Sequence, residues 1–207
     1  MTLTFAPDCV LPTHSITLLC SIMLFSAAAV LLGIKAYGVH CNGFVRRESD
    51  GKIDLWVATR SSTKSQFPSM LDHLCAGGQP QGISPTDNMV KELAEEANVP
   101  PQLARTVVPT GAVSYETLYN GALKRDVLFT FDLCLPESFT PENTDGEIAS
   151  FERVDAHRVL DIVSSTQDYK PNCSLVLLDF FFRHGFLSPN DSGYLQLFAS
   201  LRTGDCS

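Results

Sequence analysis

Four carboxylate side chains that could hold a divalent metal follow a double glycine in this sequence. The stretch reads AGGQPQGISPTDNMVKELAEEANVP (76–100), and its acids Asp87, Glu92, Glu95 and Glu96 lie within ten residues. Carboxylate oxygens are preferred ligands of hard cations such as Mg²⁺, and glycine backbone before a helix can approach phosphate oxygens closely. The stretch therefore indicates a site for a metal and a phosphate chain. The alternative is the solvated acidic face of an ordinary helix.

A helix over residues 84–97 would place the acids on one side. Ser84 suits its N-cap, because a serine hydroxyl accepts a hydrogen bond from the first turn. At about 100° per residue, Glu96 falls about 40° from Glu92, and Glu95 falls about 60° to the other side. The adjoining arc is apolar and can pack on a sheet; it holds Met89, Leu93 and Ala97. A metal ion would relieve the repulsion among the acids.

Composition limits the class of protein. The chain has 207 residues, 44% of them hydrophobic, which is enough for one substantial core. The net charge is −8 and there is no Lys/Arg cluster, so a nucleic-acid polymer is a poor partner. The seven cysteines are widely spaced without a C-x-x-C pair, which argues against a zinc site and a disulfide framework. A reducing compartment follows, either the cytoplasm or an organellar matrix.

The N-terminal region allows two interpretations. Residues 16–34 carry no charged side chain and are long enough to cross a bilayer as a helix. Lys35 follows them, so a spanning helix would leave the rest of the chain on the cytoplasmic side. The alternative is that residues 1–26 are no anchor but a remnant of a lost front domain. In that case we expect a folded domain over 27–190 and a tail over 191–207.

Strands and helices are expected to mix without regular βα alternation. We expect strand, turn and strand over 36–61, a strand over 70–78, a hairpin over 106–136, a strand over 146–155, and helices over 155–165 and 172–187. This order predicts an α/β fold of the α+β type, with a mixed sheet covered by helices on both faces.

The acidic stretch resembles the signature of a known family. Gly77, five residues, position 83, seven residues and then KELAEEANV (91–99) is similar to the Nudix box, with the same spacing. Three positions differ from the family pattern: Ile83 replaces an acid, Lys91 replaces Arg, and Asn98 replaces Gly. Asn98 is the mildest change, because Asn is the next-best residue at a left-handed helix end.

The resemblance extends over about residues 27–187. The segments GIKAYGVHCNGFV, LWVATRS, LDHLCAGGQPQGIS, LKRDVLFTFDLCLP and KPNCSLVLLDFFFRHGF are similar to the thiamine-pyrophosphokinase-associated branch of the Nudix hydrolases. That branch usually lacks the acid at position 83 and carries an extra domain before GIKAYGVH. The resemblance implies a Nudix α/β/α sandwich with a mixed sheet.

The resemblance also implies an activity, which is hydrolysis of an organic diphosphate with Mg²⁺ or Mn²⁺. Glu92 and Glu96 are the expected metal ligands, with the Gly77 carbonyl completing the shell. Glu95 is a third ligand or the base that takes the proton of water, and Glu147 resembles the acid that other members bring from a later loop. The implied substrates are damaged thiamine diphosphates, in their oxo and oxy forms, or an oxidised nucleotide such as 8-oxo-dGDP.

Basic and aromatic residues are candidates for substrate contact. They are Arg60, Lys64, Lys124 and Arg125 for the diphosphate and Tyr115 for a flat ring. The alternative for each cation is a plain surface charge. A different function is also open, in which the substitution at Ile83 marks a degenerate Nudix fold that binds a ligand or partner without turnover.

Overall fold

The computed structural model describes residues 33–119 and 121–204. Both interpretations of residues 1–26, and nearly all of the apolar segment 16–34, therefore lie outside the described residues. Within them, no helix combines the length and the apolar character that a bilayer crossing requires.

A seven-stranded mixed sheet forms the centre of the molecule, and its main path runs in the order β3-β2-β1-β6-β5. β4 pairs with β1, and β7 pairs with β2. β1 and β6 run parallel, whereas the other pairs are antiparallel. The strands are β1 (Lys35–Arg46), β2 (Ile53–Arg60), β3 (Leu71–Asp72), β4 (Cys75–Gly78), β5 (Val108–Tyr119), β6 (Ala122–Cys134) and β7 (Ile148–Asp155).

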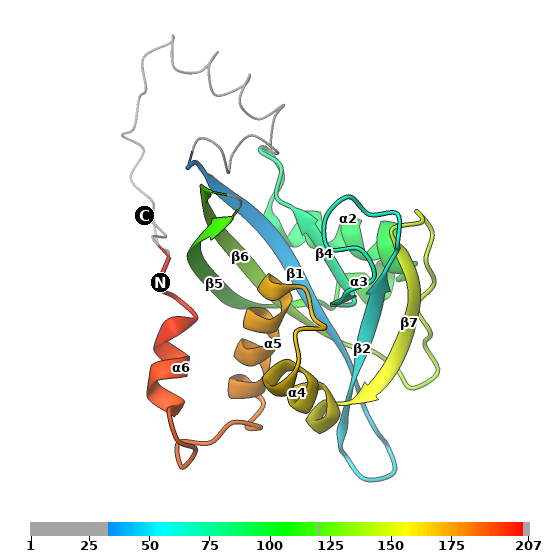
Figure 1. Cartoon of the computed structure of the whole chain (residues 1–207). Helices are drawn as coiled ribbons and strands as arrows, with labels where there is room; N and C mark the ends of the chain where they lie inside the picture. Colours follow the sequence, from blue (N-terminus) through cyan, green and yellow to red (C-terminus); the bar gives the residue numbers. More distant parts are fainter. Residues whose placement is uncertain (1–32, 120, 205–207) are drawn as a thin grey trace, which may run out of the picture.

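Helices cover both faces of this sheet (Figure 1). On one face lie α2 (Pro85–Ala97) and the short α3 (Pro101–Ala104); on the other lie α4 (Ala156–Ser165) and α5 (Pro171–Arg183). A last helix, α6 (Tyr194–Ser200), packs against α5. The predicted α/β sandwich with a mixed sheet is confirmed.

The alternation of side chains along β1 builds two separate cores. Val39 points to the first face, where it belongs to one cluster with Leu93 of α2, and both are fully buried. Phe44 points to the second face, where its ring meets that of Phe180 on α5 at 5.7 Å between centroids. Because neighbouring strand residues face opposite sides, one strand positions both helix layers.

The structure differs from the expected elements in two places. The strand expected over 70–78 is divided into β3 and β4, because the chain leaves the ladder at His73 and Leu74. Leu74 fills the space above Gly43, where an added β-carbon would lie 2.3 Å from its side chain. The segment 191–207, expected as a tail, contains α6, and the adjoining Leu201 is fully buried.

Candidate active site

The helix that carries the acids begins and ends as its sequence predicts. Ser84 is the N-cap, and its hydroxyl oxygen accepts a hydrogen bond from the Asp87 N–H at 3.1 Å. Asn98 closes the helix in the left-handed conformation, with φ 50°. The replacement of the family's glycine by asparagine therefore keeps the helix end intact.

Side chains of α2 satisfy the backbone of β4. Asn88 donates a hydrogen bond from Nδ2 to the Gly78 carbonyl at 2.9 Å. Two turns later, Glu96 Oε2 accepts a hydrogen bond from the Ala76 N–H at 3.1 Å. These contacts fix the helix along the strand, since both side chains reach the backbone of the same short strand.

Between these two anchors, Glu92 lies directly against Gly77. A β-carbon built at position 77 would lie 2.5 Å from the Glu92 carboxyl carbon and 2.8 Å from Oε1. Only glycine leaves room for this carboxylate, which explains the glycine that opens the motif. The structure thus brings Glu92 and Glu96 to adjacent residues of β4, Gly77 and Ala76.

Burial sets the electrostatics of the two carboxylates. Glu96 is 8% exposed, and the loss of solvation raises its pKa to about 7. The same cause raises the pKa of Glu92, with the negative charge of Glu95 adding to it. Two neighbouring acids that resist ionisation are suited to a divalent cation, which favours their charged forms.

Glu95 points away from these two acids. Its side chain is 54% exposed, and a carboxylate oxygen lies 2.6 Å from the Lys91 ammonium. The same lysine lies 3.5 Å from Glu92. The structure therefore does not bring Glu95 to the buried carboxylates, and it places Lys91 where it balances the exposed side of the acidic arc.

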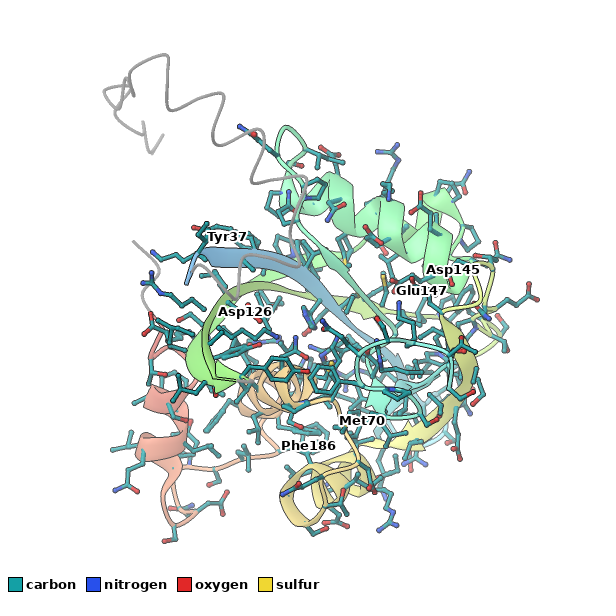
Figure 2. The ribbon with its side chains drawn as sticks, turned by 45° about the horizontal axis from the view of Figure 1, so that its top comes forward. Tyr37, Met70, Asp126, Asp145, Glu147 and Phe186 are labelled. Atoms are coloured by element: carbon teal, nitrogen blue, oxygen red, sulfur yellow. The ribbon has the colours of Figure 1, made fainter. Side chains whose placement is uncertain are left out.

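The loop before β7 supplies two more carboxylates (Figure 2). One oxygen each of Glu96, Asp145 and Glu147 lies within 4.8 Å of the others. Glu147 was predicted, whereas Asp145 was not. The loop is held to α2 by a hydrogen bond from the Thr144 hydroxyl to the Glu95 carbonyl.

These donors fit a hard divalent metal. All are carboxylate oxygens, they come from a rigid helix and a tethered loop, and one of them is buried. Lys64 reaches the same group, with its ammonium 2.5 Å from Glu147 Oε2. A lysine cation therefore already compensates part of the negative charge.

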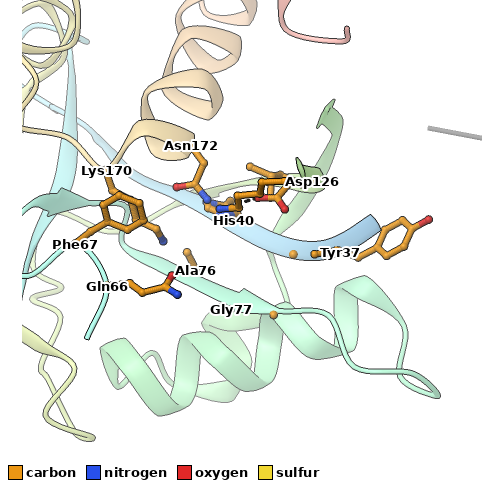
Figure 3. Close-up of a pocket in the computed structure, with 14 residues that line it drawn as sticks. Tyr37, His40, Gln66, Phe67, Ala76, Gly77, Asp126, Lys170 and Asn172 are labelled. Carbon is orange, nitrogen blue, oxygen red and sulfur yellow. Dashed lines mark ion pairs between the residues drawn. The ribbon is translucent and has the colours of Figure 1, made fainter. Parts of the chain in front are cut away.

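A cavity of about 220 Å³ adjoins the acidic cluster across β4 (Figure 3). Its small lining residues come from β1 and β4 and include Gly38 and Gly78. Phe67 forms part of its wall, in the left-handed conformation with φ 52°. Its polar lining residues are His40, Gln66, Lys124, Asp126, Lys170 and Asn172.

The predicted substrate contacts divide between this cavity and structural ion pairs. Lys124 lines the cavity and lies 3.1 Å from Asp126, which also accepts a hydrogen bond from the Tyr115 hydroxyl. Burial raises the pKa of Tyr115 far above its ordinary value, so it remains a neutral donor.

Two other predicted cations, Arg60 and Arg125, do not line the cavity. Arg60 is 9% exposed, and its guanidinium binds Asp72 at 2.7 Å and the carbonyls of Gln66 and Phe67. Arg125 binds Glu116 at 2.8 Å. The geometry favours structural roles for both, because their strongest donors are engaged.

A second group of side chains that could ligate a metal includes His40, which lines the cavity. Atoms of His40, His73 and Cys173 lie within 4.8 Å of one another, and all three residues are buried. Burial lowers the pKa of both imidazoles, and the charge of Lys170 lowers it further. That neighbouring cation, together with Arg60, disfavours a metal ion there.

Several site residues were missed at the sequence level. Asn88 could have been found, because it lies one turn before Glu92 on the acidic face. His40, Lys170 and Asp145 carry no local signal. They reach the site through strand pairing and loop packing between distant segments.

The arrangement of sheet and helices is the Nudix fold. No protein-family model matches the chain. Among solved structures, the Nudix domain of NrtR from Shewanella oneidensis, in a complex with ADP ribose, superposes with a TM-score of 0.54 at 12% identity. The match covers 72% of this chain and 88% of that domain, and it shows the fold alone.

Sequence similarity gives the same family. The chain is 51% identical over 181 residues to Nudix hydrolase 20, chloroplastic, of Arabidopsis thaliana, covering 87% of this chain and 48% of that protein. It is 48% identical to Nudix hydrolase 24, chloroplastic, of the same plant, covering 87% and 49%. The chain is therefore similar to curated Nudix hydrolases over most of its own length, and it spans about half the length of these relatives.

Proposed function

We propose that this chain hydrolyses the diphosphate linkage of a small organic diphosphate with the help of Mg²⁺ or Mn²⁺. The observation that carries the proposal is the pair of carboxylates Glu92 and Glu96, both held against β4, with Glu96 close to Glu147 as well. The alternative of a solvated acidic face does not fit, because Glu96 is buried and both carboxylates contact the strand.

In the proposed mechanism each residue has one task. Glu92, Glu96 and the Gly77 carbonyl would hold the metal, which when bound would supply positive charge for the phosphoryl oxygens and favour ionisation of the attacking water. Glu147, which is partly exposed at the edge of the cluster, accepts the proton of the attacking water. Glu95 acts outside this shell, where it positions Lys91.

The organic group is proposed to occupy the cavity on the other side of β4. This places the diphosphate at the short strand that both sites share. Lys64 and Lys124 are the cations proposed to contact it in exchange for their ion pairs with Glu147 and Asp126, and Tyr115 supports the cavity wall through Asp126. Arg60 and Arg125 act through the fold in this proposal.

We propose that this chain belongs to the thiamine-pyrophosphokinase-associated branch of the Nudix hydrolases. The substrates are then damaged thiamine diphosphates, in their oxo or oxy forms, or an oxidised nucleotide such as 8-oxo-dGDP. Both plant relatives are named as chloroplastic proteins, which supports an organellar compartment for this chain.

The test is phosphate or monophosphate release over a panel of diphosphates in Mn²⁺. The panel contains thiamine diphosphate, oxythiamine diphosphate, 8-oxo-dGDP and ADP-ribose. Turnover of at least one of them, and its loss in Glu96→Gln, supports the proposal. Tight binding without turnover in any member would favour the degenerate binding fold, for which Ile83 and the outward Glu95 are the supporting observations.

A further inference from the structure

Lys170 brings a positive charge into the cavity from the second face of the sheet. It is the N-cap residue of α5, a helix of 13 residues, and its side chain is 16% exposed. Figure 3 shows it extending from the start of α5 beside Phe67, among the residues that line the cavity. An ammonium group in such a place needs acceptors, since a buried charge without partners is costly.

Within the described part of the chain, Lys170 has one side-chain partner, Asp72, at 3.4 Å. That carboxylate is already satisfied by shorter contacts. Oδ2 accepts from Arg60 at 2.7 Å, and Oδ1 accepts from the His73 N–H at 2.9 Å and from the Cys173 thiol at 2.8 Å. Asp72 thus has three closer donors besides Lys170, and the three N–H donors of Lys170 have one long contact, the 3.4 Å ion pair with this acid.

The other polar groups around the cavity mostly act as donors or are already paired. Asp126, the acid in the lining, accepts from Tyr115 and lies 3.1 Å from Lys124. His40 is 3% exposed, and its Nδ1 has no hydrogen-bond partner in the described structure. The first turn of α5 adds the positive end of its dipole. A ligand for this cavity should therefore offer an acceptor oxygen.

We propose that Lys170 determines specificity by binding an acceptor oxygen, such as a ring carbonyl, on the organic group of the diphosphate. This inference rests on the proposed function, because it assumes that the organic group occupies the cavity. A ring that carries an amino group at the same position would set N–H donors against the ammonium. Oxo members of matched pairs are therefore selected over amino members.

The acceptor oxygen belongs to the organic group because the two sites lie on opposite sides of β4. Glu92 contacts Gly77 from the side of α2, whereas Lys170 comes from α5 on the other face. A diphosphate bound by metal at the acidic cluster would leave its attached group nearest to Lys170. A phosphate contact remains the competing source of an oxygen, and the experiment separates the two.

The experiment measures binding and turnover for three matched pairs. They are oxythiamine and thiamine diphosphate, inosine and adenosine diphosphate, and uridine and cytidine diphosphate. In each pair, one member carries a carbonyl oxygen on the ring where the other carries an amino group. Isothermal titration calorimetry in Ca²⁺ gives affinity independently of turnover, and kcat/KM is measured in Mn²⁺. The full-length chain is compared with Lys170→Met, Lys170→Arg and the matched surface control Lys52→Met, whose native side chain is 61% exposed.

For wild type we expect the oxo member of at least one pair to bind about tenfold to a hundredfold more tightly, the range for a hydrogen bond to a charged group. Lys170→Met should remove most of this preference, whereas Lys170→Arg and Lys52→Met should keep it. Thermal unfolding reports whether each variant folds. If Lys170→Met does not fold, the wild-type preference and the Lys170→Arg result still decide.

Three outcomes would overturn the inference. They are equal wild-type affinity within every pair, no detectable binding of any member, and an equal loss for both members in Lys170→Met. The last outcome would mean that Lys170 binds a phosphate oxygen, which both members of a pair share. A binding preference without turnover would leave the role of Lys170 standing and reject the proposed hydrolysis, so the two failures can be told apart.

Discussion

Glu92 packs so closely on Gly77 that a β-carbon at position 77 would lie 2.5 Å from its carboxyl carbon. The neighbouring Gly78 has nothing within 4 Å of the same added atom. The two glycines of the motif are therefore not equivalent. Both line the cavity, but only the first makes space for a carboxylate.

We predict that Gly77→Ala impairs metal use more than folding. The added methyl group displaces the end of a flexible side chain, so the melting temperature should change little. The half-saturating Mn²⁺ concentration should rise on the order of tenfold, the usual effect of disturbing the orientation of a metal ligand. Titration of Mn²⁺ against activity measures this, with Gly78→Ala as the matched control. Equal metal requirements for both variants would show that Glu92 is no ligand.

The region around this contact shows what the sequence could predict. The helix 84–97 could be placed almost to the residue, because its cap, its apolar arc and its left-handed end are local signals. The cavity could not be predicted, because Lys170 and His40 are 130 positions apart and meet only through the packing of α5 on β1. Contacts between residues so far apart in the chain leave no periodic pattern in the sequence.

The loop residues show the same limit on a smaller scale. Glu147 was expected near the acidic cluster only through the family resemblance. Its partner Lys64 was expected at the diphosphate, and the ion pair between them lies between two loops without regular structure. Arg60 has the charge of a phosphate ligand, but the carboxylate of Asp72, 12 residues later, engages it.

We predict that Glu96→Gln nearly abolishes turnover and leaves the fold intact. The amide oxygen can still accept the hydrogen bond from Ala76, but the negative charge for the metal is lost. The loss in kcat/KM at saturating Mn²⁺ should be on the order of a thousandfold. Glu152→Gln, an exposed acid on β7, serves as the control. Retention of more than about a tenth of wild-type kcat/KM would contradict the assigned role.

Metal binding should be linked to pH through Glu96. Its pKa in the folded chain is about 7, above the ordinary value of 4.5, so the neutral form favours folding. This contribution to stability is fully present below about pH 4.5 and is lost as pH rises through about 7. A metal favours the charged form. We therefore expect tighter Mn²⁺ binding at pH 8 than at pH 6, with release of a proton.

Calorimetry in two buffers of different ionisation enthalpy measures that proton release directly. Glu96→Gln should release less, since the group that loses the proton is gone. Proton release at pH 6 that is the same in the variant and the wild type would assign the linkage to another group.

We predict that Ile83→Glu folds and changes metal dependence. Position 83 lies directly before the N-cap Ser84, where a negative charge interacts favourably with the helix N-terminus. The Ile83 carbonyl, which accepts a hydrogen bond from Gln79 at 2.7 Å, is unaffected by the side-chain change. Activity is titrated with Mg²⁺ for both forms. An unchanged half-saturation would mean that the metal site does not extend to position 83.

The last prediction concerns Lys64, which occupies a position that a metal ion would contest. Its ammonium lies 2.5 Å from Glu147 Oε2, so a bound cation must compete with it for that carboxylate. Lys64→Met removes the competitor and should lower the half-saturating Mn²⁺ concentration several-fold, because the freed charge attracts the metal. If Lys64 moves to the diphosphate when metal binds, the same variant should raise KM while kcat changes less.

The two effects have opposite signs, so they can be separated in one set of assays. Metal is titrated at saturating substrate, and substrate is then titrated at saturating metal. Lys52→Met, at an exposed lysine that lies 4.0 Å from Asp50, should change neither quantity. A weaker metal response in Lys64→Met would show that the lysine supports the geometry of Glu147 and does not compete for it. An unchanged KM would remove Lys64 from the substrate contacts, because a cation that binds the diphosphate contributes to substrate affinity.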